Sequence, residues 1–191
     1  MSLSFIKVPE YDLTLSNNNV VKYRPFLIKE EKVLLMAVES RDEAEMNNAL
    51  INIVQSCTIS KVDVTKLPVY DFEYLWLNIR GKSVGEQIDL KLKCPDDDKQ
   101  TVDYSLKIED VKPDLNKKFE RKVEFEKDYG VIMKVPTIKH ISNKKTLLDL
   151  SYGLVRDCIG QIYNGDEVFE AADLSAKELD EFVNHLTTRQ F

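Results

Sequence analysis

The sequence predicts an α+β protein with an N-terminal β-hairpin and helices, a central antiparallel β-rich segment and C-terminal helices. Apolar and polar residues alternate on both sides of the asparagines at 17–19 and again over residues 88–108, as in half-buried strands. Elsewhere apolar residues recur at the three- and four-residue spacing of helices. We expect residues 1–85 and 137–191 to form a mainly helical domain and residues 86–136 an inserted β-rich subdomain, with one continuous domain as the alternative.

The N-terminal hairpin is predicted from alternating apolar residues on both sides of the asparagine turn. These residues are Tyr11, Leu13, Leu15, Val21 and Tyr23. Pro25 ends the second strand because it has no N–H for the ladder. A helix is then expected from about Ile28 to Glu39, with Glu30 and Glu31 in its first turn, where carboxylates favour the helix dipole. Its expected apolar face consists of Ile28, Leu34, Leu35 and Val38.

Two further helices are predicted from their end signals. Ser40 and Glu43 have the spacing of a capping box that opens the second helix. Pro68 occupies the first position of the third helix, and Gly81 is expected to stop it. The expected core stripes are Met46, Ala49, Leu50, Ile53 and Val54 in the second helix, and Val69, Phe72, Leu75, Trp76 and Ile79 in the third.

The middle of the chain contains the most regular hairpin pattern. The apolar residues of its two strands are Ile88, Leu90 and Leu92, then Val102, Tyr104, Leu106 and Ile108. Charged residues occupy most positions between them, so one face is expected to be apolar and the other polar. A second hairpin is expected from Val123 to Val135 around a turn at residues 127–130, with residues 113–118 as a loop before it.

The last third is expected to be helical. One helix is predicted from Leu147 to the Asn164-Gly165 end signal. The final helix has Ser175 and Glu178 as a capping box, Leu174 and Leu179 as a hydrophobic staple, and an apolar stripe of Leu179, Phe182, Val183 and Leu186. No C-cap signal precedes Phe191, so we expect either a frayed end or a longer natural chain, and favour the longer chain.

Composition limits the function classes. The 191 residues are 43% hydrophobic and 31% charged, with a net charge of −6, which disfavours a protein that mainly grips phosphate backbones. The nearby cations Lys139, Lys144 and Lys145 are interpreted as a solvated loop. No apolar run approaches the length of a membrane span, and no signal-peptide pattern begins the chain. Three widely spaced cysteines favour reduced thiols inside a cell.

The sequence predicts no catalytic, metal-binding or cofactor-binding residue. The two histidines, His140 and His185, lack a ligand spacing, and no phosphate-binding glycine motif is present. Cys57 and Cys158 follow helical apolar periodicity and are expected to be core thiols. Cys94, followed by aspartates at 96–98, is interpreted as part of a solvated turn. We therefore expect a non-enzymatic protein; the rival from another class is a small hydrolase or metal-dependent enzyme without a recognisable motif.

One motif carries a family resemblance. Tyr23-Arg-Pro-Phe26, two residues, and Lys29-Glu-Glu-Lys32 running into an apolar helix resemble the T4-like bacteriophage baseplate hub assembly proteins. Residues 173–182 and 186–191 are also similar to that family. The resemblance implies a late phage protein that helps to form the central hub of the tail baseplate through protein–protein contacts, as an assembly chaperone or hub component. A permanent structural subunit of the virion is the alternative.

The resemblance also implies partners and a place of action. Other baseplate and tail proteins are the expected partners, in the host cytoplasm during tail assembly and, for a hub component, in the virion; nucleic acid and membrane are not expected, and a homo-oligomer stays open. Lys29, Glu30, Glu31 and Lys32 are expected to project as a charged docking surface, with helix initiation and solubility as the plainer interpretation. The expected apolar contacts are Phe182, Leu186 and Phe191.

Overall fold

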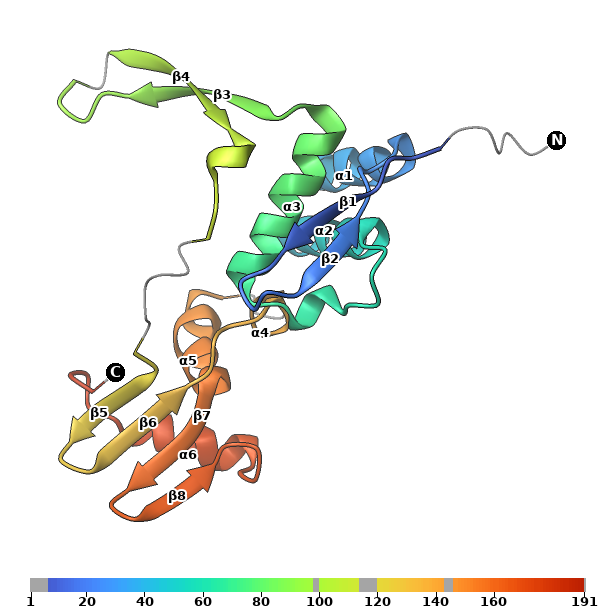
Figure 1. Cartoon of the computed structure of the whole chain (residues 1–191). Coiled ribbons are helices and arrows are strands. Elements are labelled where there is room, and N and C mark those ends of the chain that lie inside the picture. Colours follow the sequence, from blue (N-terminus) through green and yellow to red (C-terminus); the bar gives the residue numbers. More distant parts are fainter. Residues whose placement is uncertain (1–6, 98–99, 114–119, 143–145, 191) are drawn as a thin grey trace. The chain divides into compact units, whose positions relative to one another are not determined.

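A computed structural model of the chain describes residues 7–97, 100–113, 120–142 and 146–190. It divides into two compact units, residues 1–115 and residues 116–191, here called the N-terminal unit and the C-terminal unit (Figure 1). Both units combine helices with antiparallel strands, so the predicted α+β class is confirmed. The strands of residues 86–136 are distributed over both units. Independent folding of that segment as a subdomain stays a prediction.

The predicted N-terminal hairpin is confirmed. Strands β1 (Tyr11–Thr14) and β2 (Val20–Tyr23) pair antiparallel, with Leu13 opposite Val21. Asn18 adopts the left-handed conformation in the turn, with φ of 63°, which asparagine tolerates better than most residues. The inward face of the hairpin is buried: Leu13, Leu15, Val21 and Tyr23.

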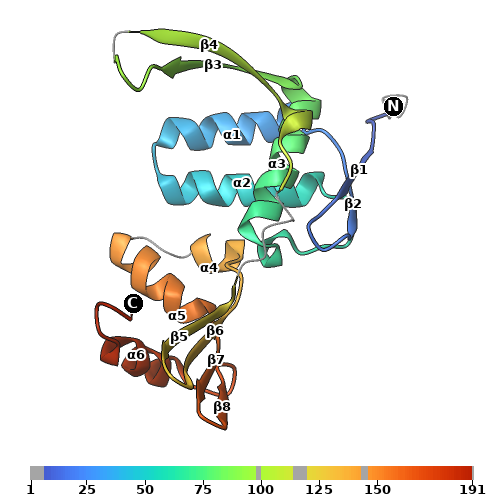
Figure 2. The same cartoon turned by 60° about the vertical axis from the view of Figure 1, so that its left-hand side comes forward.

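Three helices complete the core of the N-terminal unit. They are α1 (Ile28–Ser40), α2 (Glu43–Cys57) and α3 (Val69–Val84), with a short 3₁₀ helix, η1 (Val64–Lys66), before α3. Helices α1 and α2 lie side by side (Figure 2). The stripes of α2 and α3 supply buried residues as predicted: Ala49, Ile53, Val54, Phe72, Leu75 and Ile79. The core thiol at Cys57 is confirmed, since its side chain is fully buried.

The predicted capping box at Ser40 is wrong. Ser40 is the last residue of α1, and Asp42 caps α2 by accepting hydrogen bonds from Ala44 N at 2.8 Å and Glu45 N at 3.2 Å. Arg41 between them adopts φ of 56°, which ends α1 in a left-handed residue. Two capping side chains lie two positions apart here, and the tight turn between the helices decides which one is used.

The predicted helix end at Gly81 is also wrong. Helix α3 continues for another turn to Val84, and Gly85, with φ of 129°, ends it. Gly81 is buried beneath Ile108. The two residues are so close that a Cβ on Gly81 would lie 2.8 Å from Ile108 Cδ1. The glycine therefore serves a close approach rather than a helix stop.

The central hairpin is confirmed, with its apolar residues on one face. Strands β3 (Gln87–Lys93) and β4 (Thr101–Lys107) pair antiparallel with Leu90 opposite Tyr104. The short 3₁₀ helix η2 (Ile108–Asp110) follows β4 and buries Ile108 against α3.

The C-terminal unit is built on a four-stranded antiparallel sheet in the order β5-β6-β7-β8. Its strands are β5 (Lys122–Glu126), β6 (Tyr129–Met133), β7 (Ile159–Asn164) and β8 (Glu167–Glu170). The hairpin predicted from Val123 to Val135 corresponds to β5 and β6. Helix α6 (Ala176–His185) lies against this sheet (Figure 1) through a core of Val131, Ile159, Ile162, Ala171 and Val183.

The helix predicted from Leu147 to Asn164-Gly165 is wrong over its second half. A short helix, α4 (Ile138–Ser142), holds His140, and the π-helical turn η3 (Asp149–Gly153) leads into α5 (Leu154–Cys158). The chain then becomes β7, and Gly165, with φ of 62°, lies in the turn to β8. A short apolar run can be a buried strand or part of a helix, and Asn-Gly is a hairpin signal as well as a helix end.

The predicted capping box of the final helix is confirmed. Ser175 Oγ accepts from Glu178 N at 3.3 Å, and Glu178 Oε2 accepts from Ser175 N at 2.7 Å. Helix α6 ends at His185, and Thr187–Gln190 forms a turn in which Gln190 N donates to Thr187 O at 2.9 Å.

Candidate protein-docking surfaces

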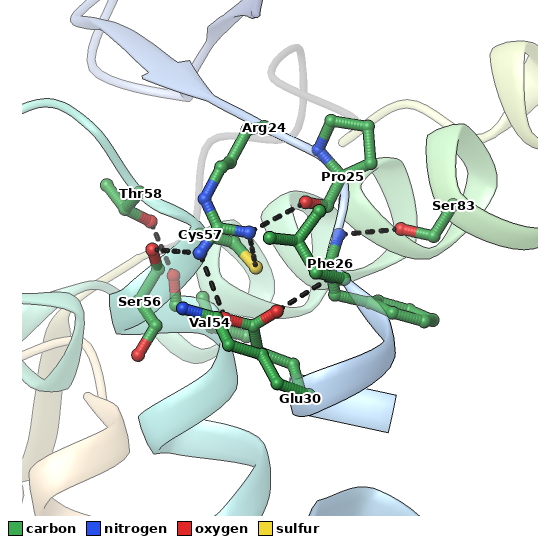
Figure 3. Close-up of polar contacts among 11 residues, drawn as sticks. Arg24, Pro25, Phe26, Glu30, Val54, Ser56, Cys57, Thr58 and Ser83 are labelled. Carbon is green, nitrogen blue, oxygen red and sulfur yellow. Dashed lines mark hydrogen bonds and ion pairs between the residues drawn. The ribbon is translucent and has the colours of Figure 1, made fainter. Parts of the chain in front are cut away.

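Arg24 organises the motif that begins at Tyr23, because its guanidinium bridges three elements (Figure 3). It donates to Pro25 O at 2.9 Å, to Ser56 O near the end of α2 at 3.1 Å, and to Glu30 Oε1 in α1 at 3.0 Å. The Cys57 thiol lies 3.7 Å from the same guanidinium. Burial raises the pKa of that thiol to about 11, so Cys57 stays protonated and is a core group rather than a nucleophile.

Glu30 is the buried counterpart of Arg24. Its side chain is turned back toward the start of α1, where Oε2 accepts from Leu27 N at 2.7 Å and Oε1 lies 3.4 Å from Lys29 Nζ. Burial disfavours the carboxylate, but the hydrogen bonds from Arg24 and Leu27 and the nearby cations outweigh it, so the pKa of Glu30 lies below its ordinary value. The pair is therefore ionised and hydrogen-bonded within the fold.

The rest of the motif fastens α1 to α3. Phe26 N donates to Ser83 Oγ at 2.9 Å, and the Phe26 ring stacks on Trp76 with 6.1 Å between centroids (Figure 3 shows the hydrogen bond). Phe26 is half-buried, whereas Leu27 is exposed. The motif thus joins β2, α1, α2 and α3.

The predicted charged docking surface is corrected at one residue. Glu30 is only 6% exposed and does not project, because Arg24 and the Leu27 N–H hold it inside. Lys29, Glu31 and Lys32 are exposed. The sequence pattern could not separate the two glutamates, since both occupy a helical first turn where charge is favourable. A docking role for the three exposed charges stays a prediction.

The Glu30 contribution to stability should depend on pH in a stated direction. Its folded-state pKa is depressed below the ordinary 4.5, so the stabilisation is present above pH 4.5 and is lost as pH falls through the folded-state pKa. We expect the stability difference between the native chain and Glu30→Gln to shrink as the pH is lowered from 7 to 3. Urea titrations followed by Trp76 fluorescence measure this stability difference. A difference that stays constant from pH 7 to pH 3 would contradict a lowered pKa of Glu30 in the folded state.

The structure places the predicted apolar contacts on or near α6. Phe182 packs against the core of the C-terminal unit, and Leu186, directly after the helix, is half-buried. Phe191 lies outside the described residues. Phe182 thus covers the four-stranded sheet, which leaves only part of its surface for a partner; the contact roles of these residues stay predictions.

An uncovered apolar surface lies on the β3–β4 hairpin, where alternation places six side chains on one face. These are Ile88, Leu90, Leu92, Val102, Tyr104 and Leu106, called here the hairpin apolar face. Four of them are 36–62% exposed. Among the described residues, no third strand joins this sheet. Figure 1 shows the hairpin extending beyond the end of α3. The alternation revealed an apolar face but gave no sign that it would remain uncovered.

Helix α1 carries a second uncovered apolar surface, because most of the apolar face expected from the sequence is exposed. Its buried residues are Glu30 and Ala37, while Ile28 and Met36 are 71% and 70% exposed. Leu35 and Val38 are exposed as well. The apolar periodicity of the sequence did not reveal the buried side of α1, because the residues buried there are a salt-bridged glutamate and a small alanine.

The described residues contain no candidate metal-binding cluster. They contain no group of three or more histidine, cysteine, aspartate or glutamate side chains that could hold a metal ion. The described histidines make local contacts, His140 Nδ1 with Thr137 N at 3.1 Å and His185 Nδ1 with Glu181 O at 2.6 Å. In the same part of the chain, no helix has both the length and the apolar character needed to cross a membrane.

Comparison with known proteins gave one match. A family model described as "T4 bacteriophage base plate protein" matches residues 8–191. Searches of curated proteins and of solved structures gave no match. The family match spans both units, including the Arg24 cluster and the hairpin apolar face.

Proposed function

The chain belongs to the T4 bacteriophage base plate protein family, and we propose that it helps to form the central hub of the baseplate through protein–protein contacts, as an assembly chaperone or a hub component. Membership itself gives a structural or assembly role in the baseplate, contacts with other phage tail proteins and a link to the virion tail. The family is typically structural rather than enzymatic.

The exposure of the hairpin apolar face is the observation that supports a protein-contact site on this hairpin. A two-stranded sheet is marginally stable in water, and it needs more strands or a packed layer against its apolar side. The described residues provide no further strand, while Leu92, Val102 and Tyr104 are about half exposed. Large uncovered apolar surfaces on soluble proteins mark interaction sites. A tail protein that packs an apolar helix or sheet on this face would supply the missing layer.

A pair of adjacent substitutions tests this surface. Val102→Glu places a charge on the apolar face, where a packed partner would have to bury it unpaired. Thr101→Glu places the same charge on the opposite face, across from Lys93 in the partner strand. With a tagged full-length chain in infected-cell lysate, we expect Val102→Glu to lose the co-purifying tail protein and Thr101→Glu to retain it.

Equal recovery of the tail protein by both variants would exclude the hairpin apolar face as its docking site. Circular dichroism and Trp76 fluorescence provide the folding control, because Trp76 lies in α3 and reports on the helical core. The exposed charges Lys29, Glu31 and Lys32 form the second proposed contact. Reversing Glu31 alone tests that contact without disturbing the buried Glu30.

Composition of the finished particle separates the two hub roles. A chaperone acts in the host cytoplasm during tail assembly and leaves, so purified virions should lack it. A hub component, or any permanent structural subunit, should be present at a fixed stoichiometry. Quantitative mass spectrometry of purified particles measures this directly, and the same sample identifies the neighbouring baseplate proteins after cross-linking.

A further inference from the structure

The outer edge of β3 has unpaired backbone N–H and C=O groups. The hydrogen-bond pattern between β3 and β4 shows which residues they belong to. Ile108 N donates to Glu86 O at 2.9 Å, and Cys94 N donates to Gln100 O at 3.0 Å. Hydrogen-bonded pairs alternate along an antiparallel ladder, so the even-numbered residues of β3 direct their N–H and C=O groups toward β4. The odd-numbered residues therefore present theirs to the outer edge: Gln87, Asp89, Lys91 and Lys93.

The side chains along this edge are complementary to those of the same edge in a second, antiparallel copy. If β3 pairs antiparallel with β3 of a second copy around a two-fold axis at Leu90, all seven residues find partners. Asp89 then faces Lys91 of the second copy, and Gln87 faces Lys93 of the second copy, each twice by symmetry. On the other face Ile88 meets Leu92 of the second copy. Opposite charges in directly facing pairs stabilise a sheet.

Neighbouring registers are disfavoured by charge. A shift by two residues in one direction places Lys91 opposite Lys91 of the second copy, and a shift in the other direction places Asp89 opposite Asp89. The first shift retains pairs of opposite charge, Asp89 with Lys93, but either shift adds a like-charge contact and shortens the ladder from seven residues to five. A shift by one residue would bring groups that already bond to β4 against the outer edge and is excluded by the ladder. Charge and hydrogen bonding thus select the same register, centred on Leu90.

The outer edge of β4 lacks this complementarity when the whole strand is paired. Its outward residues are Thr101, Asp103, Ser105 and Lys107. The full-length register, centred on Tyr104, places Asp103 opposite Ser105 and Thr101 opposite Lys107, with no pair of opposite charges. A register centred on Ser105 would place Asp103 opposite Lys107, but it pairs only residues 103–107. Among the described residues neither edge has a strand partner, and only β3 combines pairs of opposite charge with a ladder over its full length.

We propose that two copies of this chain associate through their β3 edges to form a four-stranded antiparallel sheet, in the order β4-β3-β3-β4, with Asp89 of each copy paired to Lys91 of the other. The edge groups of β3 are satisfied in this arrangement, and four strands replace a marginal two-stranded sheet. The two hairpin apolar faces join into one continuous surface. This association goes beyond the proposed hub role, because it requires no tail protein.

Sedimentation velocity of the full-length chain over a concentration series tests the pairing. The native chain should show a reversible monomer–dimer equilibrium. Asp89→Lys faces the neutral Ser105 within its own hairpin, so it should leave the hairpin intact while it places two lysine pairs across the interface. We expect dimer affinity to fall at least about tenfold. Thr101→Glu, on the other edge, should dimerise like the native chain.

A mixing experiment tests the register itself. Lys91→Glu alone should also weaken the dimer, because Asp89 would face the introduced glutamate. The new glutamate also lies opposite Asp103 in its own hairpin, so circular dichroism must first show that this variant keeps its strands. In an equimolar mixture of Asp89→Lys and Lys91→Glu chains, the introduced lysine faces the introduced glutamate and native Lys91 faces native Asp89. Mixed dimers should therefore form with near-native affinity, while each variant alone stays mainly monomeric.

Three results would overturn the proposal: a native chain that is monomeric at every concentration, an Asp89→Lys chain that dimerises normally, or a mixture that does not recover association. Circular dichroism of each variant shows whether its hairpin is retained. If a variant loses its strand signal, Asp89→Asn, which removes the attraction without adding repulsion, replaces it and should show a smaller loss of affinity in the same direction.

Discussion

Arg24→Ala is expected to destabilise the N-terminal unit by about 3 kcal/mol, because it leaves the buried carboxylate of Glu30 without its principal partner. The side chains of Arg24 and Glu30 are 17% and 8% exposed, so water replaces the lost guanidinium poorly. The same substitution removes the hydrogen bonds to Pro25 O and Ser56 O. The segment after β2, helix α1 and helix α2 therefore all lose their hydrogen bonds to the Arg24 side chain.

Urea unfolding followed by the fluorescence of Trp76 measures this loss, since Trp76 stacks on Phe26 in the same unit. Lys29→Ala is the matched control: it removes the other cation beside Glu30, but its side chain is 72% exposed, and the expected cost is below about 1 kcal/mol. Arg24→Ala with Glu30→Ala should cost less than the sum of the two single changes. Additive losses would show that the pair is not coupled.

Gly130→Ala is expected to destabilise the C-terminal unit by about 3 kcal/mol. A Cβ at this position of β6 would overlap the carbonyl oxygen of Val123, and would lie 2.5 Å from Tyr163 Oη and 2.9 Å from Glu124 Cα. Two of these three neighbours are backbone of β5, which cannot move without breaking the β5–β6 ladder. The glycine allows β5, β6 and the Tyr163 side chain of β7 to approach closely.

Native-state hydrogen exchange resolves this effect within the unit. The amides of β6 and β7 should lose protection by about a hundredfold, the equivalent of roughly 3 kcal/mol. Gly165→Asn is the control on the same sheet: the position has φ of 62° and nothing within 4 Å of an added Cβ, and asparagine tolerates that conformation. Protection in Gly130→Ala equal to that of the control would contradict the close-approach explanation.

Local patterns predicted several elements because the determining interactions are short-range. Alternation located both hairpins of the N-terminal unit and the apolar face of β3 and β4. The box of Ser175 and Glu178 located the start of α6. Each of these signals depends on side chains within one strand pair or one helical turn, so distant parts of the chain do not alter it.

Other predictions failed where contacts with residues distant in the sequence determine the secondary structure or the burial of a side chain. Ile159 and Ile162 have helical spacing, yet they form a central strand because β6 and β8 bond to both edges of β7. Gly81 lies inside α3 because Ile108, twenty-seven positions later, packs over it. Glu30 and Glu31 occupy equivalent places in the first turn of α1, and only the position of Arg24 distinguishes the buried one from the exposed one.

The sequence by itself determined the α+β class, three of the hairpins, the starts of α1 and α6, and a resemblance to T4-like baseplate proteins that the match over residues 8–191 bears out. Only the tertiary structure decided what each apolar face meets. The stripe of α6 is covered by a sheet, whereas the face of β3–β4 and much of α1 are left open. Periodicity shows that a face is apolar, but burial depends on which other segment reaches it, and that is set by long-range packing.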